Sequence, residues 1–121
     1  MSGLAIIVAT ADNGRFRAAM TTALAQAALG SAVRLYCHEA SVALLTRAAR
    51  ADDDHAMLAA AGIPDRLGLL AMAQVAGVAL IACQTGLALT GLALDSLVGG
   101  VEAGGMMSLL ATLGDDRLVS F

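Results

Sequence analysis

The chain contains no lysine and little charge of either sign, since Arg, Asp and Glu together make up 14% of its 121 residues. A typical soluble domain carries about 25% charged residues. The net charge of −3 and the 2% of aromatic residues leave no basic or aromatic surface of the kind that nucleic-acid binding needs. Two cysteines are too few for a disulfide-rich secreted scaffold. We therefore expect neither of these classes of protein.

Apolar residues are abundant, at 59% of the chain, and this excludes a disordered protein. A folded monomer of 12.1 kDa should expose roughly 6,000 Å² of surface. Seven basic and ten acidic residues are few for a surface of that size. We therefore expect part of the surface to be buried against other chains in a homo-oligomer.

Residues 67–94 contain no charge and are numerous enough to span a bilayer. Four glycines interrupt this segment, and neither aromatic residues nor a basic cluster flank it. It is therefore predicted to be helix, strand and helix, with no membrane span. The apolar run at the N-terminus is short and lacks a basic region before it, so we expect no secretory signal. The predicted location is the cytoplasm, where both cysteines stay reduced.

Apolar runs and helical stripes alternate along the chain. Strands are expected at 4–9, 32–37, 78–82 and 117–121, and a short edge strand can form within 99–105. Helices are expected from an apolar stripe between 16 and 27 and at 39–47, 57–61, 66–76, 84–89 and 106–113. This order predicts one α/β domain over 1–121, a three-layer α/β/α fold with an open, mostly parallel sheet of four to five strands.

Ligands of open α/β sheets bind beyond the carboxyl ends of the strands. Four segments are predicted to reach that edge: 11–14, 37–39, 83–85 and the glycine-rich stretch before Met106. The candidate binding residues there are Asn13, Cys37, Gln84, Thr85, Gly104 and Gly105.

Cys83 is the strongest candidate for a catalytic residue, and His38 is the second candidate. Cys83 lies between a buried strand and the start of a helix, where free N–H groups lower the pKa of a thiol. A thiolate can attack a sulfane sulfur or a disulfide. The alternative is a small, inert core cysteine. His38 can act as a general base, as an anion partner or only as a polar residue that begins a helix.

Other sites have weaker support. No CxxC or HxxxH spacing accompanies Cys37, His38, Glu39 and Cys83, so no metal is expected. No phosphate-binding glycine motif of the GxxxxGK[ST] or GxGxxG type is present, so no nucleotide cofactor is expected, although the segment 99–105 leads into a helix. Cys37 and Cys83 can form a redox pair only if they lie within disulfide distance.

The sequence at Cys83 resembles the DsrE/DsrF-like family, which includes TusD-related sulfur-relay proteins. The resemblance rests on 82–92, Ala-Cys-Gln-Thr-Gly-Leu-Ala-Leu-Thr-Gly-Leu, and on 97–105, Leu-Val-Gly-Gly-Val-Glu-Ala-Gly-Gly. It implies a three-layer domain in trimers or hexamers and a persulfide carried on Cys83, with 99–105 shaping the pocket. Relay members often have Arg-Gly where this chain has Thr90-Gly91, and Cys37-His38 matches no feature of the family.

The leading hypothesis is a cytoplasmic sulfur carrier that accepts sulfane sulfur on Cys83, assisted by His38, and passes it from a donor protein to an acceptor protein without a cofactor. Two hypotheses from other classes compete with it. One is a thiol redox enzyme that uses Cys37 and Cys83. The other is a non-catalytic oligomeric module that binds a small anion or nucleotide in the cleft at the strand ends.

Overall fold

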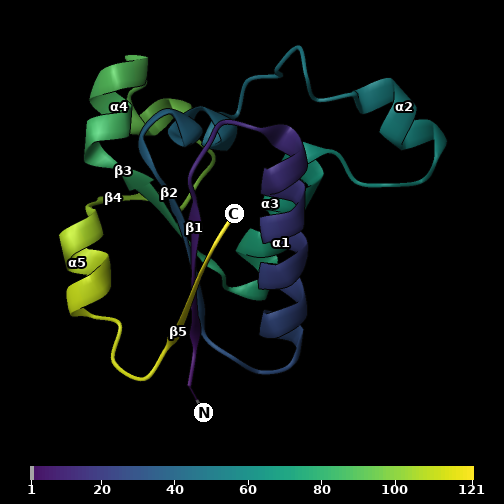
Figure 1. Ribbon diagram of the computed structural model, residues 1–121. Coiled ribbons are helices and arrows are strands. Elements are labelled where there is room, and N and C mark those ends of the chain that lie inside the picture. Colours follow the sequence, from purple (N-terminus) through teal and green to yellow (C-terminus); the bar gives the residue numbers. More distant parts are fainter. Residues whose placement is uncertain (1) are drawn as a thin grey trace.

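The strands form one sheet in which every neighbouring pair is parallel. The computed structural model describes residues 2–121, and its strand order is β4-β3-β2-β1-β5 (Figure 1). The strands are β1 (Leu4–Val8), β2 (Val33–Cys37), β3 (Ala79–Cys83), β4 (Glu102–Gly104) and β5 (Arg117–Ser120). The predicted α/β fold class is therefore confirmed, with five strands and the short edge strand at β4.

Helices cover both faces of the sheet (Figure 1). On one face lie α1 (Asn13–Ala28) and α3 (Arg66–Ala76), and on the other lies α5 (Met106–Ala111). Near the carboxyl ends of the strands, α4 (Gln84–Thr90) packs against the 3₁₀ helix η1 (Glu39–Leu45). A second short 3₁₀ helix is η2 (Leu94–Ser96), and α2 (His55–Ala60) projects away from the sheet.

Two helices begin at the aspartates that can cap them. The Asp12 side chain accepts a hydrogen bond from the amide of Arg15, and the Asp65 side chain accepts one from the amide of Gly68, each at 2.8 Å. Gly77 ends α3 with φ at +78°, a conformation that glycine adopts without steric cost. These local signals explain why the helix predicted at 66–76 has the same bounds in the structure.

The segment predicted as a helix from 39 to 47 is instead the 3₁₀ helix η1, which ends at Leu45. Glu39 begins it in the left-handed region, with φ at +46°. Side chains other than glycine rarely adopt this conformation, and the sequence carries no signal for it. The change matters because it determines where the Glu39 amide points.

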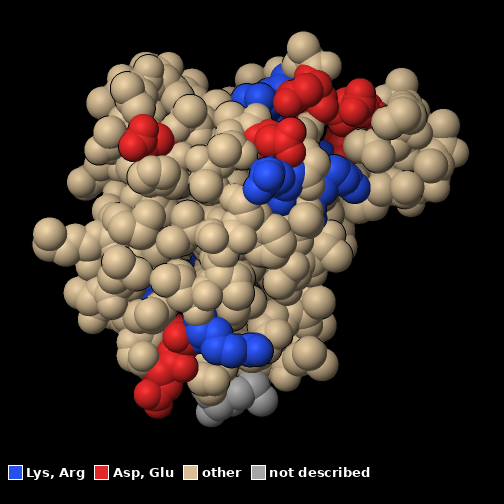
Figure 2. Space-filling model, viewed as in Figure 1, with Lys and Arg blue, Asp and Glu red and all other residues tan. Residues whose placement is uncertain are grey.

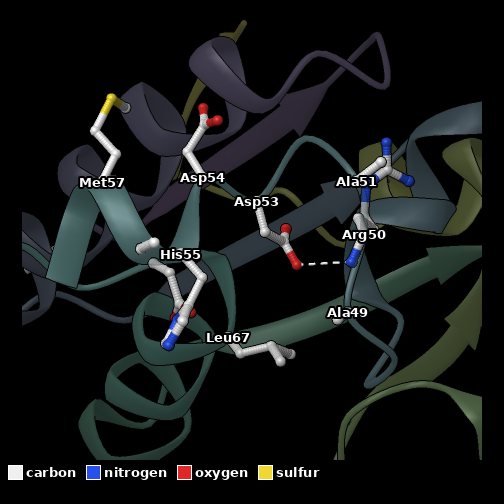
Figure 3. Close-up of a pocket in the computed structure, with 10 residues that line it drawn as sticks. Ala49, Arg50, Ala51, Asp53, Asp54, His55, Met57 and Leu67 are labelled. Carbon is white, nitrogen blue, oxygen red and sulfur yellow. Dashed lines mark hydrogen bonds and ion pairs between the residues drawn. The ribbon is translucent and has the colours of Figure 1, made fainter.

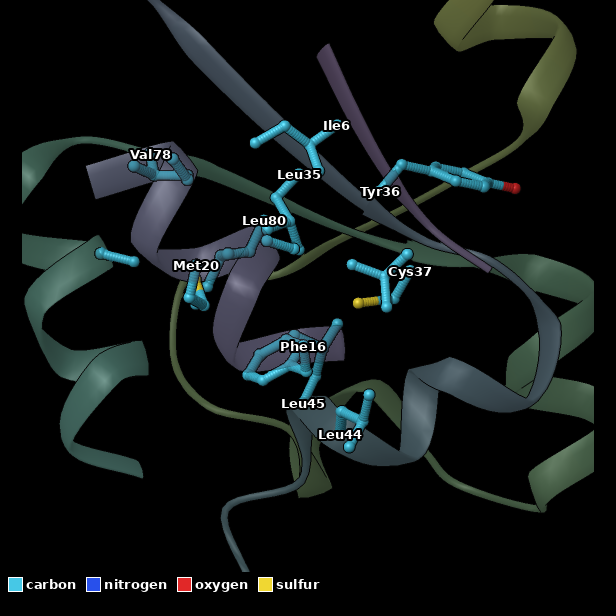
Figure 4. Packing of buried hydrophobic residues seen from close by; sticks show 14 of the residues in the cluster. Ile6, Phe16, Met20, Leu35, Tyr36, Cys37, Leu44, Leu45, Val78 and Leu80 are labelled. Carbon is cyan, nitrogen blue, oxygen red and sulfur yellow. The ribbon is translucent and has the colours of Figure 1, made fainter. Parts of the chain in front are cut away.

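The core lies mainly between the sheet and α1, α3 and η1 (Figure 4). Successive side chains of β2 point to opposite faces of the sheet, so Cys37 points toward Phe16 and Leu45 while Tyr36 points away from them (Figure 4). Tyr36 and Cys37 are both buried, at 1% and 0% exposure. The alternation in β2 therefore separates the two side chains that follow each other in the sequence.

The charge-free segment 67–94 folds as most of α3, then β3 and α4. Across residues 2–121, no helix has the length and apolar character needed to cross a membrane.

On the face shown in Figure 2, most charged side chains gather around the base of α2 and beside β5, one acidic residue lies apart near α4, and a wide, largely uncharged surface lies between the two groups. Several large apolar side chains are exposed, among them Val75 at 91% and Met107 at 85%. No residue of α2 is buried within this chain. The shortage of charge seen in the sequence thus appears as exposed apolar surface.

Candidate functional site

A small cavity of about 160 Å³ lies at the carboxyl edge of the sheet, where β2 and β3 end. The side chain of Cys83 opens onto it. The cavity is lined by Tyr36, His38, Glu39, Cys83, Gln84, Thr85, Gly104, Gly105 and Met106. The structure thus brings together five of the predicted site residues besides Cys83: His38, Gln84, Thr85, Gly104 and Gly105.

Cys83 ends β3 and occupies the position just before α4. Burial of the thiol, which is 5% exposed as a residue, raises its pKa, but the polar groups beside the sulfur outweigh this effect. The groups that lower the pKa are the Tyr36 hydroxyl and the backbone amides of Glu39, Gly86 and Thr85. The pKa of Cys83 is therefore lowered from the ordinary thiol value, which favours the nucleophilic thiolate.

The amides that surround the sulfur come from two separate elements. Thr85 and Gly86 belong to the first turn of α4, and Glu39 begins η1. Because α4 has only seven residues, these directed N–H groups account for the stabilisation better than a helix dipole does. The left-handed backbone of Glu39 costs roughly 1–3 kcal/mol and lets its amide face the thiol.

Gly86 allows the two elements to approach each other. A Cβ atom at this position would overlap the carbonyl of Glu39 and lie 2.6 Å from Cγ2 of Val42. Gly104 has a similar role on the other side, because a Cβ there would lie 2.8 Å from Cγ2 of Ile81. Gly104 is also the partner of Cys83 in the pairing of β3 with β4. Both glycines therefore bring backbone close to the sulfur.

His38 lies in the same cavity with one ring nitrogen unused. Its Nδ1 atom is buried and has no hydrogen-bond partner, while Nε2 lies 3.4 Å from the carboxylate of Glu39. The side chain is 35% exposed. A buried nitrogen without a partner is available to a group that enters the cavity.

Cys37 does not line this cavity. It pairs with Ala82 in the register of β2 with β3, whereas Tyr36 pairs with Ile81. Cys37 therefore points to the face opposite Cys83, and burial raises the pKa of its thiol to about 12. Both cysteines are free, and a bond between them would require the backbone to move.

Asn13 also lies outside the cavity. It begins α1, and its side-chain amide donates to the carbonyl of Asp52 at 2.7 Å. Thr90, where relay proteins often have arginine, donates its hydroxyl to the carbonyl of Gly86 at 2.8 Å, within its own helix. Neither side chain lines the cavity around Cys83.

Tyr36 and the amide of Glu39 are the contributors that sequence reasoning did not assign to the site. A signal for Tyr36 was present, because alternation along 33–37 places it on the opposite face from Cys37. Nothing in the sequence indicates the left-handed conformation of Glu39. As for metals, residues 2–121 contain no group of three His, Cys, Asp or Glu side chains able to hold an ion.

A larger cavity, of about 650 Å³, lies between α2 and the segment before it (Figure 3). It is lined by Ala49, Arg50, Ala51, Asp53, Asp54, His55, Ala56, Met57, Asp65 and Leu67. Two of its three carboxylates are already engaged: the amide of Arg50 donates to Asp53, and Nδ1 of His55 lies 2.6 Å from Asp65. It contains no thiol, so we assign the chemistry to the smaller cavity.

Two solved structures are similar to this chain over their whole length. The YchN protein from E. coli matches with a TM-score of 0.80 and 20% identity, covering 100% of both chains. MTH1491 from Methanobacterium thermoautotrophicum, described as a protein of unknown function, matches with a TM-score of 0.70 and 15% identity, again over 100% of both chains. Both neighbours have the DsrE/DsrF-like fold. No protein-family model and no curated protein matches the sequence.

Proposed function

We propose that this chain is a sulfur carrier of the DsrE/DsrF-like family and that Cys83 holds the transferred sulfur as a persulfide. The observation that supports this most directly is the cluster of polar groups beside Cys83, which opens onto the cavity just before α4 and whose thiol pKa these groups lower. A structural cysteine has no need of such a cluster, whereas a thiolate that must form repeatedly does. The likeness of the fold to YchN and MTH1491 is consistent with the proposal.

Charging of the carrier is a thiol exchange reaction. The Cys83 thiolate attacks the outer sulfur of a donor persulfide, R–S–SH, and the bond between the two donor sulfurs breaks. The electron pair leaves with the donor sulfur as R–S⁻, and Cys83 becomes Cys83–S–SH. No oxidant, reductant or metal takes part, because the sulfane sulfur keeps its oxidation state through the exchange.

The cavity is suited to one additional sulfur atom. Its volume of about 160 Å³ is several times the roughly 30 Å³ share of one water molecule, so the outer sulfur can occupy it beside the lining side chains. The His38 side chain lines the same space, and a rotation of its ring would let the unpartnered Nδ1 hydrogen-bond the outer sulfur. Delivery to an acceptor protein then frees Cys83 for another cycle.

The test is mass spectrometry of the intact protein after incubation with a cysteine desulfurase and cysteine, or with thiosulfate. We expect the wild type and Cys37→Ser to gain the mass of a sulfur atom, and Cys83→Ser to gain none. Cys37→Ser is the matched control because it removes a thiol that does not line the cavity. Labelling that is absent at Cys83, or that persists in Cys83→Ser, would refute the proposal.

We also propose that the carrier is a homo-oligomer, a trimer or hexamer. The exposed side chains of Met72 and Val75 on α3 and of Met107 and Leu110 on α5 support this, as does the absence of any buried residue in α2. A helix of six residues is not stable in water without packing partners. Light scattering that finds a monomer at micromolar concentration would exclude the assembly.

A cytoplasmic location follows from the same chemistry, because a carrier thiol must stay reduced between turnovers. Labelling of Cys83 in intact cells with membrane-permeant and impermeant alkylating reagents would test it.

A further inference from the structure

The side chain of Tyr36 lines the same cavity as Cys83, and its hydroxyl has the largest of the effects that lower the pKa of the Cys83 thiol. Tyr36 is also the only tyrosine of the chain, which has no tryptophan. It is 1% exposed, so its hydroxyl has little access to water. Burying a phenol costs free energy unless its O–H finds a partner, and the Cys83 sulfur in the same cavity can accept from it.

Strand register holds this pair together. Tyr36 lies opposite Ile81 in the parallel pairing of β2 with β3, and Cys83 is two residues beyond Ile81. Residues two apart share a face of the sheet, so both side chains project from the same face of adjacent strands. The contact therefore depends on the rigid centre of the sheet and not on a loop.

Few other charges act on the sulfur. His38, which precedes η1, and Glu39, which begins it, line the cavity, while α4 contributes the neutral Gln84 and Thr85. The remaining elements contribute Gly104, Gly105 and Met106, which have no titratable group. No Lys or Arg side chain lines this cavity. Charge that develops on the sulfur must therefore be stabilised by the amides and by the Tyr36 hydroxyl.

Building on the proposed carrier role of Cys83, we propose that Tyr36 is a catalytic residue of sulfur delivery, because its hydroxyl stabilises the Cys83 sulfur as the leaving group. In delivery, a nucleophile attacks the outer sulfur of Cys83–S–SH. The bond between the two sulfurs breaks, and its electron pair stays on the Cys83 sulfur. Tyr36 donates its hydrogen bond to this new thiolate, and its proton remains on the phenol oxygen.

The direction of the effect follows from the chemistry of exchange. A thiol with a lower pKa leaves faster, although its thiolate attacks more slowly. Burial and the hydrogen bond to Cys83 raise the pKa of Tyr36 well above its usual value, so the phenol keeps its proton throughout the neutral range. Tyr36 therefore speeds the release of sulfur from Cys83. At high pH, where the thiol is fully ionised, it also makes the Cys83 thiolate a slower nucleophile when the carrier is charged.

The experiment compares Tyr36→Phe with a protein in which the single tyrosine is replaced biosynthetically by 3-fluorotyrosine. Fluorine makes the phenol a stronger donor and leaves its shape nearly unchanged. All proteins also carry Cys37→Ser, so that alkylation reports on Cys83 alone. Thr90→Val is the control, because it removes a hydroxyl close to the site that donates to the carbonyl of Gly86 and not to the thiol.

Two measurements are made on each protein. The first is the pH dependence of iodoacetamide alkylation, which gives the pKa of Cys83 without any sulfur loading. The second is the rate at which cyanide removes sulfur from the loaded protein as thiocyanate, after loading at a pH high enough to ionise Cys83 in every variant.

We expect Tyr36→Phe to raise the alkylation midpoint by about one pH unit and to slow thiocyanate release about threefold to tenfold. The fluorotyrosine protein should have a lower alkylation midpoint and faster thiocyanate release than the wild type. Thr90→Val should change neither the midpoint nor the rate. An unchanged midpoint and rate in both Tyr36 proteins would overturn the inference. If Tyr36→Phe fails to fold, the alkylation midpoint and release rate of the fluorotyrosine protein still test whether the Tyr36 hydroxyl stabilises the Cys83 sulfur. If the wild type cannot be loaded, the carrier proposal fails while the alkylation midpoints still show whether Tyr36 stabilises the thiolate.

Discussion

Replacing Arg66 with methionine should destabilise the protein strongly and in a pH-dependent way. Arg66 is fully buried, and its guanidinium donates to both carboxylate oxygens of Asp53, at 2.7 and 3.2 Å. It also donates to the carbonyl oxygens of Leu44, Thr46 and Ala48 at 2.7–2.8 Å. These contacts attach the segment that follows η1 to α3. Methionine fills much of the same volume and makes none of them.

The expected cost is about 3–5 kcal/mol, the range found when one partner of a buried ion pair is removed and the other charge stays buried. Asp53 is 6% exposed, so its carboxylate cannot regain hydration without local opening. With an unfolding entropy of about 2.1 cal/mol/K per residue, the loss corresponds to a Tm roughly 12–20 °C lower. Arg47→Met, which changes an exposed arginine, is the matched control and should shift the Tm by only a few degrees.

The pH dependence gives the sharper test. Burial raises the pKa of Asp53, but the hydrogen bonds from Arg66 and from the Arg50 amide lower it further, so the net pKa is below the usual value. In the wild type this contribution to stability is present above the ordinary Asp pKa of about 3.9 and is lost as the pH falls through the lowered value. In Arg66→Met the unpaired, buried carboxyl has a raised pKa, so acid relieves the penalty.

The difference in unfolding free energy between wild type and Arg66→Met should therefore shrink as the pH falls from 7 to about 4. Urea unfolding at several pH values, followed by circular dichroism, measures it. A constant difference across this range, or a loss under about 1 kcal/mol at pH 7, would refute the assignment of Arg66 and Asp53 as a buried, mutually dependent pair.

Other predictions concern the site and the helix ends. Gly86→Ala should separate α4 from η1, because its Cβ overlaps the Glu39 carbonyl, and we expect the alkylation midpoint of Cys83 to rise while circular dichroism shows the fold retained. In the native wild type, iodoacetamide at pH 8 should label Cys83 and leave Cys37 unlabelled until denaturant is added, as peptide mapping would show; early labelling of Cys37 would contradict its placement in the core. Asp12→Ala should lower stability by about 1 kcal/mol in urea unfolding, since the cap on Arg15 is lost; no change would indicate that water replaces it.

Local signals were sufficient for most of the fold. The apolar run at the start of the chain predicted β1, and the Asp65 cap together with Gly77 predicted both ends of α3. Such elements depend on residues a few positions apart, so their signals lie within a short window of sequence. The segment 39–45 departed from prediction, because its 3₁₀ geometry follows from packing against α4, an element some forty residues away in the chain.

The candidate site, too, was predicted from the sequence only in part. The position of Cys83 between a strand and a helix was evident from the sequence, and so was its neighbourhood of Gln84, Thr85, Gly104 and Gly105. Asn13 and Cys37 also reach this edge of the sheet, but the directions of their side chains exclude them from the cavity. A sequence indicates which strand ends meet at an edge more readily than it indicates which side chains face one another there.

By itself, the sequence determined the order of strands and helices, the parallel sheet and the strand-end location of Cys83, because hydrophobic periodicity is a local signal and alternating strands and helices favour a parallel sheet. The tertiary structure alone decided which groups surround the sulfur. The Tyr36 hydroxyl reaches Cys83 through strand register, and the Glu39 amide reaches it through a left-handed residue and the close packing at Gly86. Tyr36 and Glu39 lie about forty-five positions before Cys83 in the sequence, and the geometry that brings them together is set only when the sheet and η1 pack together.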